Sequence, residues 1–467
     1  MAPTAAEIRA GLDHPVIDAD GHGIEYLPWF RDLLRDEGGA GAVDAWNVVE
    51  NSSAFTRTLD DETKRALGFF RVSWWGLPTE NTRDRATAML PALLHERLDE
   101  LGIDVAVCYP TYGLTVMGLD DPHVRVAAAR AFNTYYAQAY AGLRDRLEPV
   151  AIVPTFAPDE AIDVLEHAVE TLGLRAIMCT GLVHRPLPGE NLPRGARWVD
   201  ALGLDSAHDY DPLWRRFVEL GVTPTFHSTG MGWGSRTSPS SYVANHVGSF
   251  AAAGEALCRS LLLGGVMTRF PELRFAFLEG GVTWAAALCS DLVGHLEKRH
   301  SDAIGRYDPA RLDRAQLTEL IERYGNLGVR ARIGDLDNAL HMLSEPDEDL
   351  SRLDEFATSG LRSPTDIRST FARQCFFGCE ADDPTWAIAF APEYHGTRLG
   401  AMFASDLGHW DVPDATHVLP EAWELVENGL VSTDEFRAFT YDHALALWGP
   451  ELFADTVVAK PSGRALQ

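Results

Sequence analysis

Three ionisable side chains alternate along a short stretch near the N-terminus. Residues 16–22 read Val-Ile-Asp-Ala-Asp-Gly-His, which separates Asp18, Asp20 and His22 by one residue each. In extended backbone such alternate side chains point to one face. Three ionisable groups at one strand end are costly to bury unless they are paired or bind a cation. A solvated turn is the other interpretation, because Asp and Gly favour turns.

The elements that must position these residues are short apolar runs, most of them followed by a helical pattern. The eight predicted strands are Val16–Asp20, Ile103–Tyr109, Val150–Pro154, Arg175–Thr180, Val222–His227, Leu273–Glu279, Gln374–Cys379 and Gly400–Asp406. This alternation predicts a parallel α/β architecture, and eight units favour a closed (β/α)8 TIM barrel. A doubly wound open sheet is the alternative, although no Gly-x-Gly-x-x-Gly follows a strand.

The chain is expected to form a single domain over residues 1–467, with insertions at about 30–80, 185–210 and 300–370. The first insertion belongs to a long, Trp-rich, irregular segment at about 26–78. It is too rich in aromatic residues to be disordered, so we expect a lid over a site. The second is rich in Pro and Gly, and the third is mostly polar and helical or irregular.

Ionisable residues stand at the ends of four predicted strands. The first strand leads into Asp20 and His22, the fifth ends in His227, the sixth in Glu279 and the eighth in Asp406. In a barrel, catalytic residues come from these carboxyl ends, and the first and eighth strands are neighbours. Two imidazoles with carboxylates suit zinc or another divalent transition metal. An open coordination position would hold water or a substrate oxygen.

Each of these residues also has a structural interpretation. His227 could be a core histidine, Glu279 could pair with an arginine, and Asp406 could cap the next helix. The occurrence of such residues at four strand ends together favours a metal site.

Several residues on loops near the predicted mouth could support the site. His409, three residues after Asp406, could donate a hydrogen bond to a metal ligand, or it could be an ordinary loop histidine. His184, Arg185, Arg236 and His246 could bind an anionic substrate, and Trp233 could form part of an aromatic wall. A solvated or core role is the alternative for each. The other tryptophans near these loops are Trp74, Trp75, Trp284 and Trp410.

Composition limits the function classes. The net charge is −28, from 40 Lys and Arg against 68 Asp and Glu, which argues against nucleic acid and anionic membranes as partners. No apolar run is long enough to span a bilayer, and no signal-peptide pattern opens the chain.

The six cysteines lie mostly in apolar runs, which fits buried, reduced thiols in a cytoplasmic protein. No lysine lies in a strand-like run, which excludes a strand-borne carboxylated lysine bridging two metals.

The motifs together resemble the amidohydrolase superfamily, in the branch that includes aminocarboxymuconate-semialdehyde decarboxylase. The motifs that carry the resemblance are Ile-Asp-Ala-Asp-Gly-His at 17–22, Leu-Asp-Glu-Leu-Gly-Ile-Asp at 98–104, His227, Gly-Gly-Val-Met-Thr-Arg-Phe-Pro-Glu-Leu-Arg at 264–274, Gly280-Gly281 and Ser-Asp-Leu-Gly-His at 405–409. The resemblance implies one metal, held by a His-x-His pair, a strand-five His and a strand-eight Asp. Asp20 stands in place of the first His of the pair. Glu279 stands where the branch has a catalytic His.

We therefore expect a mononuclear metal-dependent hydrolase with Asp20, His22, His227 and Asp406 as ligands. Its expected substrate is a small carbonyl compound, with aromatic compounds and carboxylic acids among the options. His227, Asp406 and Glu279 are the expected catalytic residues: Asp406 would accept a proton from water and Glu279 would give one to the leaving group. Zinc is the expected metal, and manganese or iron also fits this ligand set. The alternatives are a non-oxidative decarboxylase of an aromatic or enoic acid, and a metal-free binding barrel. Relatives of this kind often form homodimers.

Overall fold

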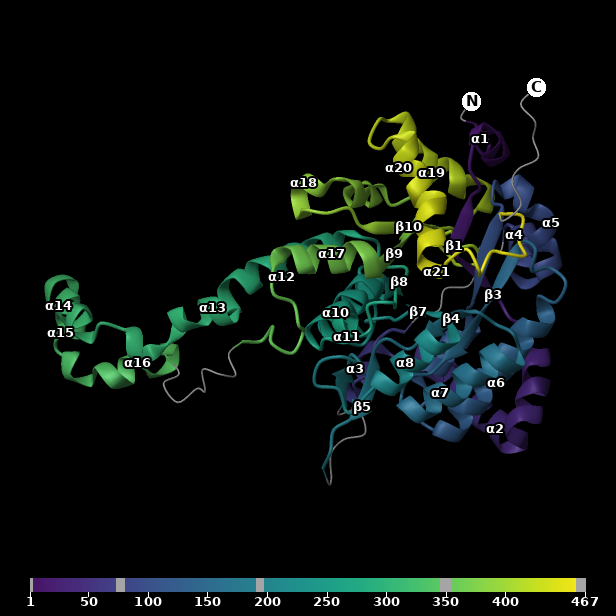
Figure 1. Ribbon diagram of the computed structural model, residues 1–467. Coiled ribbons are helices and arrows are strands. Elements are labelled where there is room, and N and C mark those ends of the chain that lie inside the picture. The colour runs from purple at the N-terminus through teal and green to yellow at the C-terminus, as the bar shows by residue number, and fades with distance from the viewer. Residues whose placement is uncertain (1–2, 73–79, 190–196, 345–353, 459–467) are drawn as a thin grey trace.

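The centre of the molecule is a parallel barrel sheet (Figure 1). The structure is a computed structural model that describes residues 3–72, 80–189, 197–344 and 354–458. The strands are, in their spatial order, β1 (Ile17–Gly23), β2 (Val105–Pro110), β3 (Leu147–Val153), β4 (Ala176–Cys179), β7 (Thr223–Phe226), β8 (Phe275–Phe277), β9 (Cys375–Glu380) and β10 (Gly400–Ala404). All eight predicted strands are present within a few residues of their expected bounds, and the (β/α)8 prediction is confirmed.

The barrel closes where β1 meets the end of β10. The backbone N–H of Asp406 donates to the carbonyl of Asp20 (3.0 Å), and the N–H of His22 donates to the carbonyl of Leu407 (3.0 Å). The Asp18 carboxylate accepts hydrogen bonds from the Ser405 backbone N–H (2.9 Å) and hydroxyl (2.6 Å). The register of β1 against β2 shifts between Asp18 and Gly21. Asp18 therefore connects β1 to the end of β10, whereas Asp20 and His22 reach the mouth.

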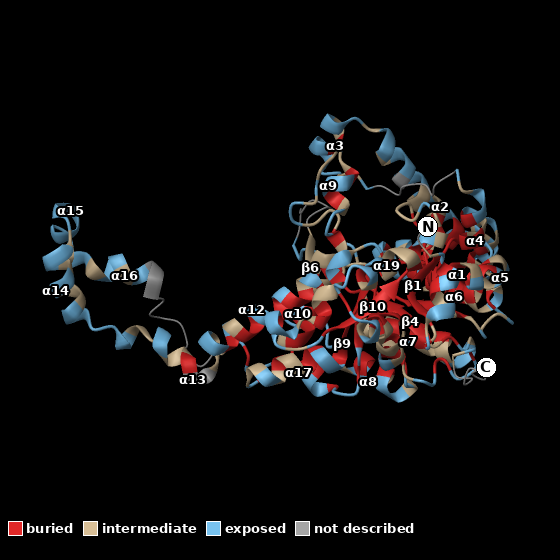
Figure 2. Cartoon of the chain, turned by 90° about the horizontal axis from the view of Figure 1, so that it is seen from above, coloured by how far each residue is buried: buried red, intermediate tan, exposed pale blue. Residues whose placement is uncertain are grey.

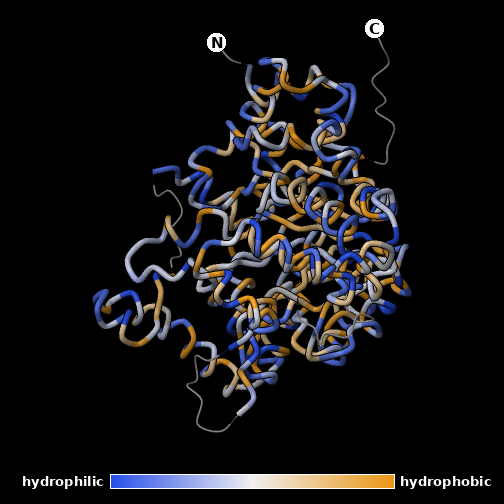
Figure 3. Tube along the Cα trace, turned by 90° about the vertical axis from the view of Figure 1, so that its left-hand side faces the viewer, coloured by the Kyte–Doolittle hydropathy of each residue, from blue (hydrophilic) through white to orange (hydrophobic). Residues whose placement is uncertain are grey.

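Helices surround the sheet, and their ends follow the sequence. The main ones are α4 (Thr82–Met89), α5 (Pro91–Leu101), α6 (Pro122–Ala139), α7 (Pro158–Glu166), α8 (Asp211–Leu220), α10 (Ser249–Leu263), α12 (Thr283–Arg299), α17 (Pro364–Gln374), α19 (Val418–Glu427) and α21 (His443–Trp448). Pro begins several of them, and Gly102 ends α5 in the left-handed conformation that glycine tolerates best. Hydrophobic and hydrophilic residues alternate along most segments (Figure 3), as expected for helices that cover a sheet with one face.

The prediction of an irregular segment at 26–78 is wrong for most of its length. Residues Leu27–Thr58 form helix α2, interrupted at Gly39, and Asp61–Leu67 form α3. Aromatic side chains pack α2 against α6: the rings of Phe30 and Phe132 stack with centroids 3.9 Å apart, and Trp46 contacts Phe132 edge-on. These aromatic residues serve a helix–helix interface, and Trp46 also lines the cavity beside His227. Trp74 and Trp75 lie outside the described residues.

The other two insertions have different structures. Residues Val183–Pro186 (β5) and Arg197–Asp200 (β6) pair as a small antiparallel sheet. Beyond α12, a chain of short helices extends away from the barrel (Figures 1 and 2). It contains α13 (Ser301–Ile304), α14 (Arg314–Tyr324), α15 (Leu327–Arg330) and α16 (Leu336–Ser344). We call residues 301–344 the arm.

The core and the cysteines agree with the expected compact interior. Large side chains such as Tyr109, Phe277 and Phe377 are almost fully buried, and the last two pack against Trp284 between the sheet and α12. All six cysteines are buried and unpaired. Among the described residues, no helix combines the length and the apolar character needed to cross a membrane.

Candidate metal centre

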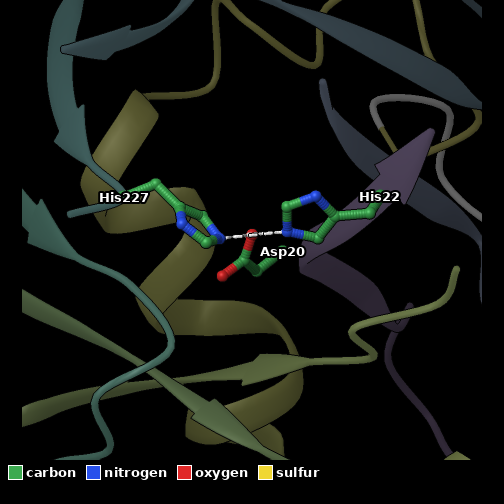
Figure 4. Close-up of side chains that lie close together, drawn as sticks. All are labelled: Asp20, His22 and His227. Atoms are coloured by element: carbon green, nitrogen blue, oxygen red, sulfur yellow. Dashed lines mark hydrogen bonds and ion pairs between the residues drawn. The ribbon is translucent and has the colours of Figure 1, made fainter. Parts of the chain in front are cut away.

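The four predicted metal-ligand side chains meet at the mouth of the barrel. The Nε2 atom of His22 lies 3.0 Å from Nε2 of His227 and 3.5 Å from Oδ1 of Asp20. It also lies 3.7 Å from Oδ1 of Asp406. Figure 4 shows the Asp20 carboxylate between the two imidazole rings. His22 belongs to two groups of possible metal ligands, and within each group the donor atoms lie within 4.8 Å of one another. The first group adds Asp20 and His227, and the second adds Asp406 and His409.

The donor atoms fit a cation because the chain leaves them without hydrogen-bond partners. Oδ1 of Asp20, both carboxylate oxygens of Asp406 and Oε2 of Glu279 are buried and accept no hydrogen bond from described residues. His409 Nδ1 approaches Asp406 Oδ1 to 2.6 Å, but without the alignment of a hydrogen bond. Buried oxygens of this kind are normally paired or bound to a metal.

Burial also shifts the pKa of each group toward its neutral form. It raises the pKa of Asp20 to about 6, with His227 acting in the opposite direction. It lowers the pKa of His22 to about 3 and of His227 to about 4. The pKa of Asp406 is raised well above its usual value, first by burial and then by neighbouring carboxylates. Neutral imidazoles are the form that binds metals, so the histidines are ready to act as ligands.

Glu279 lies beside the predicted ligands. Its Oε2 is 3.1 Å from Nε2 of His227, its Oε1 is 3.8 Å from Nδ1 of His409, and its side chain is 6% exposed. Burial raises its pKa well above the usual range, and Glu380, Asp20 and Asp411 add to the effect. The geometry therefore places a carboxyl group that favours its protonated form within reach of the two histidines.

Two of the predicted catalytic residues have left-handed backbone conformations. Glu279 has φ of 59° and Asp406 has φ of 47°, which side-chain-bearing residues rarely adopt. Such conformations cost about 1 kcal/mol or more and persist only where the surroundings impose them. Here they aim both carboxylates into the mouth at the points where β8 and β10 end.

Three further residues of the mouth were not singled out from the sequence. Glu380 ends β9, one residue beyond the expected strand end, and burial with nearby acidic groups raises its pKa to about 8. Asp411 acts electrostatically on both Glu279 and Asp406. The Thr111 hydroxyl lies 3.3 Å from His22 Nδ1 and 3.4 Å from His409 Nε2, and so bridges the two rings. Only the position of Glu380, directly after a strand, could have been found from the sequence.

The predicted substrate-binding residues do not all reach the same place. A cavity of about 620 Å³ opens beside the metal centre, and His184 lines it together with His227 and Thr111. Trp233, Arg236 and His246 are not among its described lining residues. Arg236 donates to the carbonyl of Gly248 (2.8 Å), and the His246 ring lies against Tyr242, Phe250 and Trp410.

Two other loop residues have structural partners. Arg185 pairs with Asp200 and donates to the Tyr210 hydroxyl (2.8 Å), which holds β5 to its surroundings. Trp284 packs edge-on against Phe277 and Phe377 in the core.

Comparison with known proteins agrees with this architecture. The amidohydrolase family model matches residues 84–449. The chain belongs to the amidohydrolase family. It is accordingly an enzyme of the hydrolase or carboxy-lyase type. The match includes His227, Glu279 and Asp406 and begins after Asp20 and His22. No curated protein matches the chain.

Solved structures share the fold of this amidohydrolase. An amidohydrolase from Mycobacterium avium subsp. paratuberculosis K-10 is 18% identical, with a TM-score of 0.53, and the match covers 94% of this chain and 100% of that one. A dihydroxybenzoic acid decarboxylase from Polaromonas sp. JS666, with bound manganese and the inhibitor 2-nitroresorcinol, is 14% identical with a TM-score of 0.50. That match covers 94% of this chain and 98% of the other. At these identities the likeness concerns the fold.

Proposed function

We propose that this amidohydrolase is a mononuclear metal-dependent hydrolase that adds water to a carbonyl carbon. The observation that carries the proposal is the pairing of a metal-ligand set with a separate buried acid. Oε2 of Glu279 lies 3.1 Å from the ligand nitrogen of His227. Hydrolysis of a carbonyl derivative needs both a group that takes a proton from water and a group that protonates the departing atom.

The proposed ligands are Asp20, His22, His227 and Asp406. Their unpartnered oxygens and neutral imidazoles support this assignment, and the set suits zinc first, with manganese or iron as alternatives. A divalent cation held there would supply Lewis-acid chemistry, which polarises a carbonyl and lowers the pKa of a water molecule.

The chain's own residues would then manage the protons. Asp406 would accept the proton that water loses, because neither of its carboxylate oxygens is engaged in a hydrogen bond. Glu279 would donate a proton to the leaving group, since its raised pKa favours the protonated form. A cation acts on this pKa in the opposite direction, and the alkaline limb of the kcat profile measures the balance.

Thr111 and His409 are proposed as positioning residues. If His22 binds the metal through Nε2, its Nδ1 carries the proton and donates to the Thr111 hydroxyl (3.3 Å). That hydroxyl can then donate to Nε2 of His409 (3.4 Å), which leaves the His409 proton on Nδ1, facing Asp406. The threonine thereby fixes the tautomer of both rings.

Substitution of Glu279→Gln tests the proposal. We expect kcat on an ester, lactone or amide substrate to fall by about a hundredfold or more, because the amide cannot donate an acidic proton. Metal content should stay unchanged. Glu272→Gln, at an exposed position before β8, is the matched control and should keep full activity.

Unchanged turnover in Glu279→Gln would contradict the assigned role. Release of carbon dioxide from an aromatic or enoic acid, without incorporation of oxygen from water, would instead assign decarboxylation to the same site.

A further inference from the structure

The cavity beside the metal centre has a mostly apolar wall. Its volume is about 620 Å³, within the range of pockets that enclose drug-sized ligands. His227 and Thr111 belong to its metal-side wall, whereas Trp46 and Val49 of α2 contribute apolar surface on another side. The apolar lining residues are Leu27, Trp46, Val49, Val72, Tyr112, Leu114, Met117, Leu182, Met231 and Phe250. A wall of this kind stabilises a bulky apolar group by removing it from water.

The mouth and the cavity offer a substrate carboxylate few cationic partners. The acidic groups at the mouth are Asp20, Glu279, Glu380, Asp406 and Asp411, and among the described residues none of them forms an ion pair with a lysine or arginine. Arg57 is the one such cation among the described residues that line the cavity. It belongs to the last turn of α2 rather than to a strand end, and Glu50 lines the cavity with it. A carboxylate that enters this cavity would therefore lose hydration without gaining an arginine or lysine partner from the described strand ends.

We infer that the substrate is an uncharged carbonyl compound, such as an ester, lactone or amide, that carries a bulky apolar acyl or aryl group. The apolar group lies in the cavity against α2, and the carbonyl faces His227. This inference rests on the proposed function, because it names the substrate class of the same site.

Calorimetric titration of the metal-loaded protein with two matched probes tests it. Octanophenone is an apolar neutral ketone, and para-heptylbenzoate is an anion of similar size and shape. We expect the ketone to bind at least about tenfold more tightly, a difference of about 1.4 kcal/mol. Equal or tighter binding of the carboxylate would overturn the inference.

Two adjacent positions of α2 provide a matched pair of variants. Val49 lines the cavity, whereas Val48 is 63% exposed. Val49→Trp should weaken octanophenone binding by about tenfold or more, because the indole occupies cavity space. Val48→Trp should leave it unchanged, and equal binding by the two variants would also overturn the inference.

Turnover separates this inference from the proposed function. Hydrolysis of para-nitrophenyl octanoate with a higher kcat/KM than para-nitrophenyl acetate would support both. Selective binding of the ketone without hydrolysis of any ester, lactone or amide would contradict the proposed function and support the binding inference. Ester hydrolysis combined with preference for para-heptylbenzoate would overturn the inference alone.

Discussion

Buried carboxylates occur in two settings in this molecule. Some have arginine partners: Asp84 pairs with Arg97 at 2.6 Å, and Glu148 pairs with Arg144 at 2.7 Å. At the mouth, the ion-pair partners of Asp20, Asp406 and Glu279 are histidines, which burial keeps neutral. These five carboxylates are all largely buried, and they differ in the residue type that faces them.

This difference marks the part of the fold where we propose that a cation binds. A buried charge without a counterion lowers the stability of the fold by several kcal/mol. Bound metal would supply the missing counterion at the mouth. The left-handed conformations of Glu279 and Asp406 add a local backbone cost at the same place.

Removal of an arginine from the paired setting should have the largest effect. Arg97 is 3% exposed and donates to Asp84 and to the Thr87 hydroxyl. Arg97→Met should lower the free energy of unfolding by about 3–5 kcal/mol, because it leaves Asp84 buried without its cation. Urea unfolding measures this. Arg35→Met removes an exposed pair with Asp32 and should cost less than about 1 kcal/mol. An equal loss of unfolding free energy in the two variants would contradict the claim that the buried pair matters more than the exposed one.

The unpaired setting should make the metal-free protein less stable as pH rises. Glu380 has an ordinary pKa of 4.5 when unfolded and about 8 when folded, because burial and nearby acidic groups disfavour its charge. A raised folded pKa gives stability that is present below pH 4.5 and is lost as pH rises through about 8. Glu380→Gln should therefore flatten the decline across this window, by up to about 5 kcal/mol in total, because each unit of pKa difference corresponds to about 1.4 kcal/mol.

Urea unfolding of metal-free parent and variant at several pH values between these limits measures the effect. Glu424→Gln, on α19, is a control that should leave the parent slope unchanged. If the free energy of unfolding falls with pH at the same rate in the parent and in Glu380→Gln, ionisation of Glu380 does not destabilise the folded protein.

The smallest effect should come from the hydroxyl that bridges two histidines. Thr111→Val preserves shape but removes the group that lies 3.3 Å from His22 and 3.4 Å from His409. We expect metal affinity to fall by about tenfold, as is usual when a partner of a ligand histidine is lost. Thr111→Ser should restore it. A valine variant with parental metal affinity would assign Thr111 a packing role only.

Much of the fold could be predicted because its signals are local. Apolar runs bounded by turn residues gave all eight barrel strands, and Gly102 marked the end of α5. Helix α2 was missed because its aromatic residues were interpreted as a lid. Phe30 and Leu34 are buried four residues apart, and Val43 and Trp46 are buried three residues apart, which are spacings that a helix brings onto one side. The break at Gly39 separates the two pairs and interrupts the pattern. The partner of that side, α6, is distant in the chain.

The candidate site was partly predictable for the same reason. Residues directly after a strand, such as His227 and Asp406, reach the mouth because the fold brings strand ends together. Loop residues such as Arg236 and Trp233 have no such constraint, and the structure places them outside the lining of the cavity. Thr111 could not be predicted from the sequence, because the two histidines that its hydroxyl contacts are distant from it in the chain.

Elemental analysis of protein purified without added metal tests the central claim most directly. The parent, His227→Ala and Asp406→Ala are compared, with His417→Ala, at a surface position, as the control. We expect about one equivalent of a divalent transition metal in the parent and in the control, and loss of it in the two site variants. A parent that takes up no metal even after incubation with zinc or manganese, or site variants that retain it fully, would contradict the account.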